Sequence, residues 1–135
     1  AHMMSAAAMG ATAFQKGLGA IHAMSHPVGA VFNTHHGTTN AVCMPAVLAL
    51  NAPMIRDRFE RATPYLGIEG GFDGFCEFVQ DFNDSFAIPR RLGEMGVTGD
   101  RVDDLVAMAL EDPSCGGNPV PLTADNLRAL FEASI

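Results

Sequence analysis

A histidine-rich stretch from Gly17 to Gly37 constrains the fold more than any other part of the sequence. It holds four of the five histidines and contains no acidic side chain. His22 and His26 are four positions apart, so on a helix they lie on one face, one turn above the other. Pro27 lacks an N–H group and disfavours helical geometry in the residue before it, so we expect this helix to end there.

The chain beyond the proline brings further histidines back towards the first pair. Gly29 and Asn33 predict a turn, and His35 and His36 follow it directly before Gly37 and a new apolar, helix-like run. Neutral imidazole is a suitable ligand for iron, zinc, copper and nickel. The spacing therefore indicates a candidate metal corner, and it also leaves open that these histidines are purely structural.

The residue identities in this segment give more information than the histidine spacing alone. The run KGLGAIHAMSHPVGAVFNTHHGTTNAVCMP, residues 16–45, resembles the signature of the iron-containing (group III) alcohol dehydrogenases. That signature has a G-x-x-H-x-x-x-H-P-[LV]-G-A core, a short connection, then H-G-x-x-N-A and a Met/Leu-Pro. The matching positions are Gly19, His22, His26, Pro27, Val28, Gly29, Ala30, His36, Gly37, Asn40, Ala41 and Pro45.

The resemblance implies roles for three of the histidines. His22 and His36 match two metal ligands of the family, with Fe(II) as the expected ion and zinc as a possible replacement. His26 matches the histidine near the nicotinamide of NAD(P) and the substrate, which makes it the candidate catalytic proton relay and cofactor contact. His35 matches no family role, and we interpret it as a polar turn residue.

The resemblance also implies a fold, that of the helical C-terminal domain of iron alcohol dehydrogenases, which is dehydroquinate synthase-like. The family enzymes are longer, with an N-terminal nucleotide-binding domain and two further metal ligands, an Asp and a His, from an earlier helix. No G-x-G-x-x-G run follows a strand in this sequence. We therefore expect residues 1–3 to be an expression-tag remnant and residues 4–135 to be a truncated C-terminal helical metal-binding domain.

Composition narrows the function classes. A chain of 135 residues with 48% hydrophobic residues fits one domain with a moderate core. The net charge of −7 argues against nucleic acid and anionic membranes as partners. We expect no transmembrane span and no signal peptide. Cys43, Cys76 and Cys115 lack C-x-x-C spacing, which favours reduced thiols and a cytoplasmic location.

Hydrophobic periodicity predicts an all-α fold of about six helices. The first, Met4 to His26, is expected to be central and buried because its circumference is almost wholly apolar or small. The other expected helices are residues 38–50 capped by Thr38 or Thr39, 53–62, 72–86, a helix capped by Asp100 to about 110, and a helix capped by Thr123 to about 133.

Three local patterns carry further expectations. A phenylalanine stripe on the helix over residues 72–86 is interpreted as core. Cys43 lies in an apolar run and is expected in the core as well. For Asn40, a capping role is favoured over a hydrogen bond inside the histidine site.

Two functions from different classes fit these observations. The first is the C-terminal portion of an iron-dependent, NAD(P)-linked alcohol dehydrogenase that acts on a small alcohol or aldehyde, expected to be inactive as this chain alone. The second is a non-catalytic helical domain that self-associates through apolar surface. Either reading predicts a homo-oligomer with no nucleic acid or membrane partner.

Overall fold

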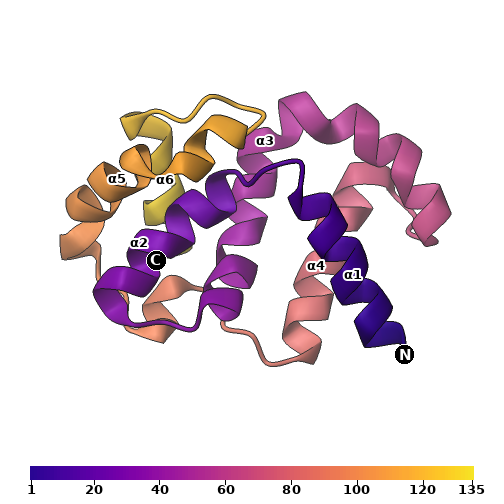
Figure 1. Ribbon diagram of the computed structural model, residues 1–135, viewed down its shortest axis with the longest axis horizontal. Coiled ribbons are helices and arrows are strands. Elements are labelled where there is room, and N and C mark those ends of the chain that lie inside the picture. Colours follow the sequence, from indigo (N-terminus) through magenta and orange to yellow (C-terminus); the bar gives the residue numbers. More distant parts are fainter.

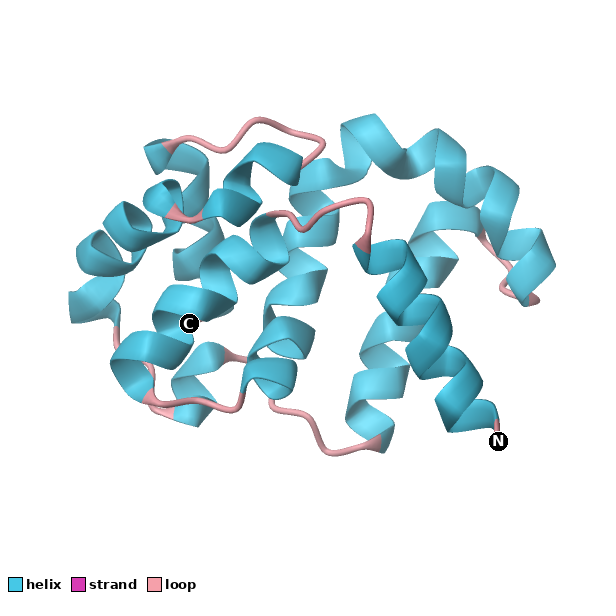
Figure 2. Cartoon of the chain, viewed as in Figure 1, coloured by secondary structure: helices cyan, strands magenta, loops and turns pink.

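The computed structural model describes residues 1–135 and confirms the all-α prediction (Figures 1 and 2). Six α-helices and three short 3₁₀ helices form the fold, and it contains no strand. The α-helices are α1 (His2–Phe14), α2 (Ala20–Phe32), α3 (His36–Leu66), α4 (Gly71–Ser85), α5 (Val102–Glu111) and α6 (Ala124–Ser134). The 3₁₀ helices are η1 (Leu92–Met95), η2 (Gly99–Arg101) and η3 (Pro113–Gly117).

The main core lies where α2, α3, α5 and α6 meet. Its largest fully buried side chains are Phe131, Met24, Leu92, Leu105 and Leu127. Cys43 belongs to this core, as expected, and burial raises the pKa of its thiol to about 12. The three cysteines are free thiols. Helix α2, which carries the histidine pair, packs against α3, α5 and η3.

A smaller core joins the later part of α3 to α4. Its buried residues are Leu48, Phe72 and Val79. Phe59 and Phe75 pack against them, and the ring centroids of these two phenylalanines are 4.6 Å apart. The phenylalanine stripe is core only in this first part of α4. Further along the helix it is exposed, at Phe78 (46%), Phe82 (54%) and Phe86 (66%), so the core interpretation was wrong for these three rings.

Helix α1 stands apart from both cores. Every residue from His2 to Phe14 is exposed, including the large apolar side chains Met9 and Phe14. The predicted single buried helix from Met4 to His26 is therefore wrong. The chain leaves helical geometry after Phe14 and passes through Gly17, whose φ of +93° suits glycine and breaks the helix. Figure 1 shows this connection as an extended link between α1 and α2.

Helix α3 is one continuous helix where two were predicted. Pro45, Pro53 and Pro64 all lie inside it. A proline removes the hydrogen bond to the carbonyl four residues earlier, which for Pro45 is the carbonyl of Ala41. The side chain of Asn83 on α4 donates its Nδ2–H to that Ala41 oxygen at 3.2 Å. The neighbouring helix thus replaces the bond that the proline deletes.

Most of the later helices match their predicted positions. Thr123 caps α6 as expected, in a reciprocal capping box with Asn126. Asp100, by contrast, lies inside the 3₁₀ helix η2, and α5 begins after it without a side-chain cap. The glycine-rich connection before α4 is a turn, in which Gly67 and Gly70 have positive φ.

By length and composition alone, α3 is the one helix that could cross a membrane. Core helices of water-soluble proteins pass the same test, and α3 packs against α2, α4 and α6 in this fold. Its later half also carries the charged run from Arg56 to Arg61.

Candidate metal centre

Three imidazole rings gather where α2 faces the start of α3. The ring centroids of His22 and His26 are 5.5 Å apart, those of His22 and His36 are 5.2 Å apart, and those of His26 and His36 are 5.4 Å apart. The first pair shares a face of α2, as its spacing predicted. The tight return of the chain brings His36 to the same place.

The helix that carries the pair does not end at the proline. Pro27 lies inside α2, which runs on to Phe32, so the predicted stop was wrong. The helix ends instead at Asn33, which takes the left-handed conformation with φ +53°. Pro27 and its neighbour Val28 are buried, and this packing offsets the lost backbone hydrogen bond.

His35 directly precedes α3, and its side chain bonds to Thr38. Its Nδ1 accepts the backbone N–H of Thr38 at 3.3 Å, so it is the N-cap of the helix. Thr38 and Thr39, the predicted caps, lie inside the helix. His35 is thus a local structural residue, in agreement with its interpretation as a turn residue.

Asn40 lies inside the cluster. Its Nδ2 is 3.3 Å from Nε2 of His22 and 3.1 Å from Nε2 of His36. An amide N–H₂ only donates, so both ring nitrogens must accept and each ring carries its proton on Nδ1. The Oδ1 atom of Asn40 is buried and has no hydrogen-bond partner. The expectation that Asn40 caps the helix is therefore wrong.

The electrostatics of the cluster favour neutral imidazole at His22. Burial lowers the pKa of His22, and the neighbouring His36 and His26 lower it further because a second positive charge nearby is unfavourable. Neutral imidazole with a free lone pair is the form that binds metal ions. In this structure the Nε2 lone pair of His22 is engaged by the Asn40 amide, as is that of His36.

Asp112 is a member of the site that the sequence did not indicate. Its Oδ2 is 2.7 Å from Nδ1 of His26, across 86 positions of sequence. Partial burial acts to raise the pKa of the Asp112 carboxyl, but hydrogen bonds from Ser114 and His26 outweigh it, so the pKa lies below its usual value. No spacing pattern connects Asp112 with the histidines, and its own segment was predicted to be irregular.

The segment after Asp112 is tied to the start of α2. Asn118 Oδ1 accepts the backbone N–H of Ala20 at 3.1 Å and the side-chain N–H of Asn51 at 3.0 Å. A Cβ on Gly117 would lie 1.9 Å from the backbone oxygen of Leu18, so only glycine permits this approach. These contacts hold the loop beside the histidine helix.

Chemically, the site offers two converging nitrogen ligands and one histidine–carboxylate pair. No group of three or more His, Cys, Asp or Glu side chains is arranged to hold a metal ion.

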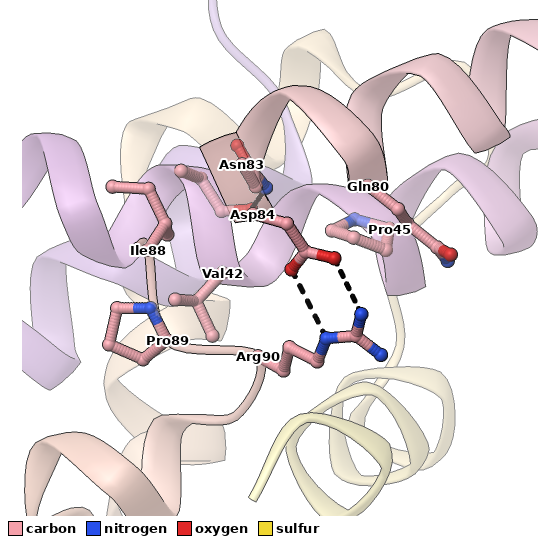
Figure 3. A pocket seen from close by; sticks show the side chains of 9 residues that line it. Val42, Pro45, Gln80, Asn83, Asp84, Ile88, Pro89 and Arg90 are labelled. Atoms are coloured by element: carbon pink, nitrogen blue, oxygen red, sulfur yellow. Dashed lines mark hydrogen bonds and ion pairs between the residues drawn. The ribbon is translucent and has the colours of Figure 1, made fainter. Parts of the chain in front are cut away.

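A groove of about 140 Å³ lies away from the histidines, between α3, α4 and the connection that follows α4. Figure 3 shows its lining, which includes Val42 and Pro45 from α3 and the ion pair of Asp84 with Arg90. None of the histidines lines this groove.

Comparison with known proteins finds a family model and relatives that match most or all of the chain. The family profile described as "Fe-containing alcohol dehydrogenase family, C-terminal" matches residues 1–135. A 4-hydroxybutyrate dehydrogenase of Cupriavidus necator is 41% identical over 143 aligned positions, which cover 99% of this chain and 37% of that protein. A lactaldehyde reductase of Escherichia coli (strain K12) is 31% identical, with 87% of this chain and 33% of that protein covered.

Solved structures give the same result for the fold. The structure of a 1,3-propanediol oxidoreductase superposes with a TM-score of 0.81 at 26% identity, covering 87% of this chain and 33% of that one. An iron-containing alcohol dehydrogenase from Corynebacterium glutamicum has a TM-score of 0.72 at 32% identity, covering 88% and 32%. The chain thus spans about a third of the length of the relatives that it matches.

Proposed function

The chain belongs to the Fe-containing alcohol dehydrogenase family, and from that membership we propose that residues 4–135 form the helical metal-binding part of an iron-dependent, NAD(P)-linked enzyme. Its substrate would be a small alcohol or the matching aldehyde, and its product would arise by hydride transfer to or from nicotinamide. The family and the geometry of the histidine cluster support this proposal together.

The residues present fit part of an iron site. The observation that carries the proposal is that Nε2 of His22 and Nε2 of His36 converge on one point, at which the Asn40 amide donates to both. The Oδ1 atom of Asn40 is buried and accepts no hydrogen bond from the protein, so a polar interaction is missing at this point. Imidazole nitrogens suit iron and zinc alike, so the donor chemistry fits Fe(II) and does not exclude zinc.

His22 and His36 would hold the ion, and His26 would move the proton. When bound, iron supplies Lewis acidity towards an alcohol or carbonyl oxygen. His26 lies in the same cluster with its Nδ1 engaged by Asp112, so its Nε2 is free to exchange a proton with the substrate side. The chain does not contain the nucleotide-binding glycine run, so we propose that hydride transfer needs a further nucleotide-binding part.

Metal titration by calorimetry tests this function directly. We expect the purified chain to bind Fe(II) or Zn(II) through His22 and His36, and we expect His22→Ala with His36→Ala to abolish that binding. His35→Asn is the matched control, because it removes the neighbouring imidazole and keeps an acceptor at the α3 N-cap. Binding that survives in the double variant, or that is lost equally in the control, would contradict the assignment.

A second function is favoured by a separate observation, the complete exposure of α1. Its large apolar side chains are Met3, Met4, Met9 and Phe14, with exposed fractions between 56% and 82%. Exposed apolar surface of this kind favours association between copies. We therefore also propose self-association through α1, which sedimentation of the chain with and without residues 1–16 tests. An unchanged oligomeric state would reject it.

A further inference from the structure

A carboxylate from a distant loop reaches the proposed proton relay. Asp112 Oδ2 and His26 Nδ1 are 2.7 Å apart, which is a short distance for a hydrogen bond between these atom types. The Asp112 side chain is 12% exposed, whereas the His26 side chain is 41% exposed. The pair thus has a mostly buried carboxylate next to a more exposed imidazole ring.

Residues that directly follow Asp112 in the sequence fix the position of its carboxylate. Asp112 Oδ1 accepts the backbone N–H of Ser114 at 2.8 Å, which leaves Oδ2 for the histidine. The carbonyl oxygen of Asp112 accepts the N–H of Cys115 at 3.0 Å. Pro113 follows, and a residue before proline is restricted to the extended geometry that Asp112 adopts, with φ −70° and ψ 130°.

The hydrogen-bond chemistry of the pair determines the tautomer of His26. An ionised carboxylate only accepts, so the proton between the two atoms must belong to Nδ1. The other ring nitrogen, Nε2, then carries the free lone pair. His35 offers the opposite arrangement in the same chain, because its Nδ1 accepts the N–H of Thr38 and its proton must lie on Nε2.

We propose that Asp112 is a positioning residue that fixes the ring orientation and the Nδ1–H tautomer of His26, so that Nε2 can act as the proton acceptor. The use of that nitrogen in alcohol oxidation rests on the proposed function, whereas the tautomer rests on the geometry alone. Carboxylate–histidine pairs elsewhere act in this way, by orienting the imidazole without taking its proton. A purely structural Asp112 would cap η3 and leave His26 unaffected.

The experiment measures imidazole tautomers by two-bond ¹H–¹⁵N correlation in the ¹⁵N-histidine-labelled chain, at a pH where the rings are neutral. We expect the Nδ1–H form at His26 and the Nε2–H form at His35. Either an Nε2–H form or the mixture typical of free imidazole at His26 in the unsubstituted chain would overturn the proposal. This first reading requires no variant and no metal.

Asp112→Asn then tests the cause. An asparagine keeps an oxygen for the Ser114 N–H and places an N–H₂ group beside His26, so Nδ1 must accept and the tautomer should invert to Nε2–H. Asp100→Asn removes an exposed carboxylate of the same charge and should leave His26 unchanged. An unchanged tautomer in Asp112→Asn would reject the positioning role.

The His35 signal guards against an unfolded variant, because its tautomer depends on the α3 N-cap and not on Asp112. If Asp112→Asn fails to fold, the tautomer in the unsubstituted chain still decides the geometry. Failure of metal binding in the calorimetric titration would reject the proposed function and would not alter these spectra. The two proposals therefore fail separately.

Discussion

At the scale of single residues, Asn40 stands out because its amide nitrogen has two partners and its amide oxygen has none. A donor placed between two imidazole lone pairs mimics the positive charge that those lone pairs would otherwise bind. Replacing that donor with an acceptor oxygen would complete a set of three ligands for a cation.

We therefore predict that Asn40→Asp binds Fe(II) or Zn(II) about tenfold more tightly than the unsubstituted chain. The added carboxylate oxygen would take the position beside the two Nε2 atoms and contribute a negative charge. Asn33→Asp is the matched control, since it makes the same substitution at the exposed end of α2 and should leave the affinity unchanged. Equal calorimetric affinities for Asn40→Asp and the unsubstituted chain would contradict the prediction.

Single residues also show which parts of the site could be predicted from the sequence and which could not. The helical spacing of His22 and His26 was enough to place them together, because the period of an α-helix is fixed. The approach of His36 followed from a short connection. For Asn40 a capping role was favoured over a hydrogen bond inside the site, because the residue lies near a predicted helix start. Asp112 was missed because it reaches the site only through the packing of α5 and η3 on α2.

At the scale of elements, the prolines explain most of the differences from the predicted fold. Helices were expected to end at Pro27 and to begin afresh at Pro53, yet α2 and α3 continue through them. A proline costs a helix roughly 3 kcal/mol by intrinsic propensity. At Pro27, burial of the surrounding face outweighs that penalty. Pro53 itself is exposed. Sequence periodicity alone does not reveal how much burial a face will gain.

The replacement bond at Pro45 gives a testable consequence. Asn83→Ala would leave the Ala41 carbonyl without a partner, and we predict a loss of about 1–3 kcal/mol in the free energy of unfolding. In a Pro45→Ala background residue 45 can supply its own N–H to that carbonyl, so the same substitution should cost less. Urea unfolding of the four proteins of this cycle measures the difference, and equal losses in both backgrounds would show that the bond has no such role.

At the scale of the whole molecule, stability should be concentrated in the four-helix core and absent from α1. Phe131 is fully buried where α6 enters the core, whereas every residue of α1 is exposed. The sequence predicted the opposite for α1, because an apolar composition indicates a tendency to be buried and does not specify a partner within this chain.

We accordingly predict that removal of residues 1–16 changes the free energy of unfolding by no more than about 0.5 kcal/mol. Phe131→Ala should cost about 3–5 kcal/mol, since it leaves a cavity in the core. Denaturant unfolding at low protein concentration measures both values and limits any contribution from association. A large loss on removal of α1 would mean that it packs on the rest of the chain.

The tie between Asp112 and His26 has a consequence for the order of folding. The three imidazoles and Asn40 all lie between residues 22 and 40, so they need only the closure of one local helical hairpin. The contact with Asp112 spans 86 positions and must wait for α5 to dock. Because chain-entropy costs delay contacts of high sequence separation, the histidine cluster should assemble early and His26 should acquire a fixed tautomer only in the last steps. If the proposed function is right, a chain that is still folding would thus be able to bind a cation before the tautomer of His26 is fixed.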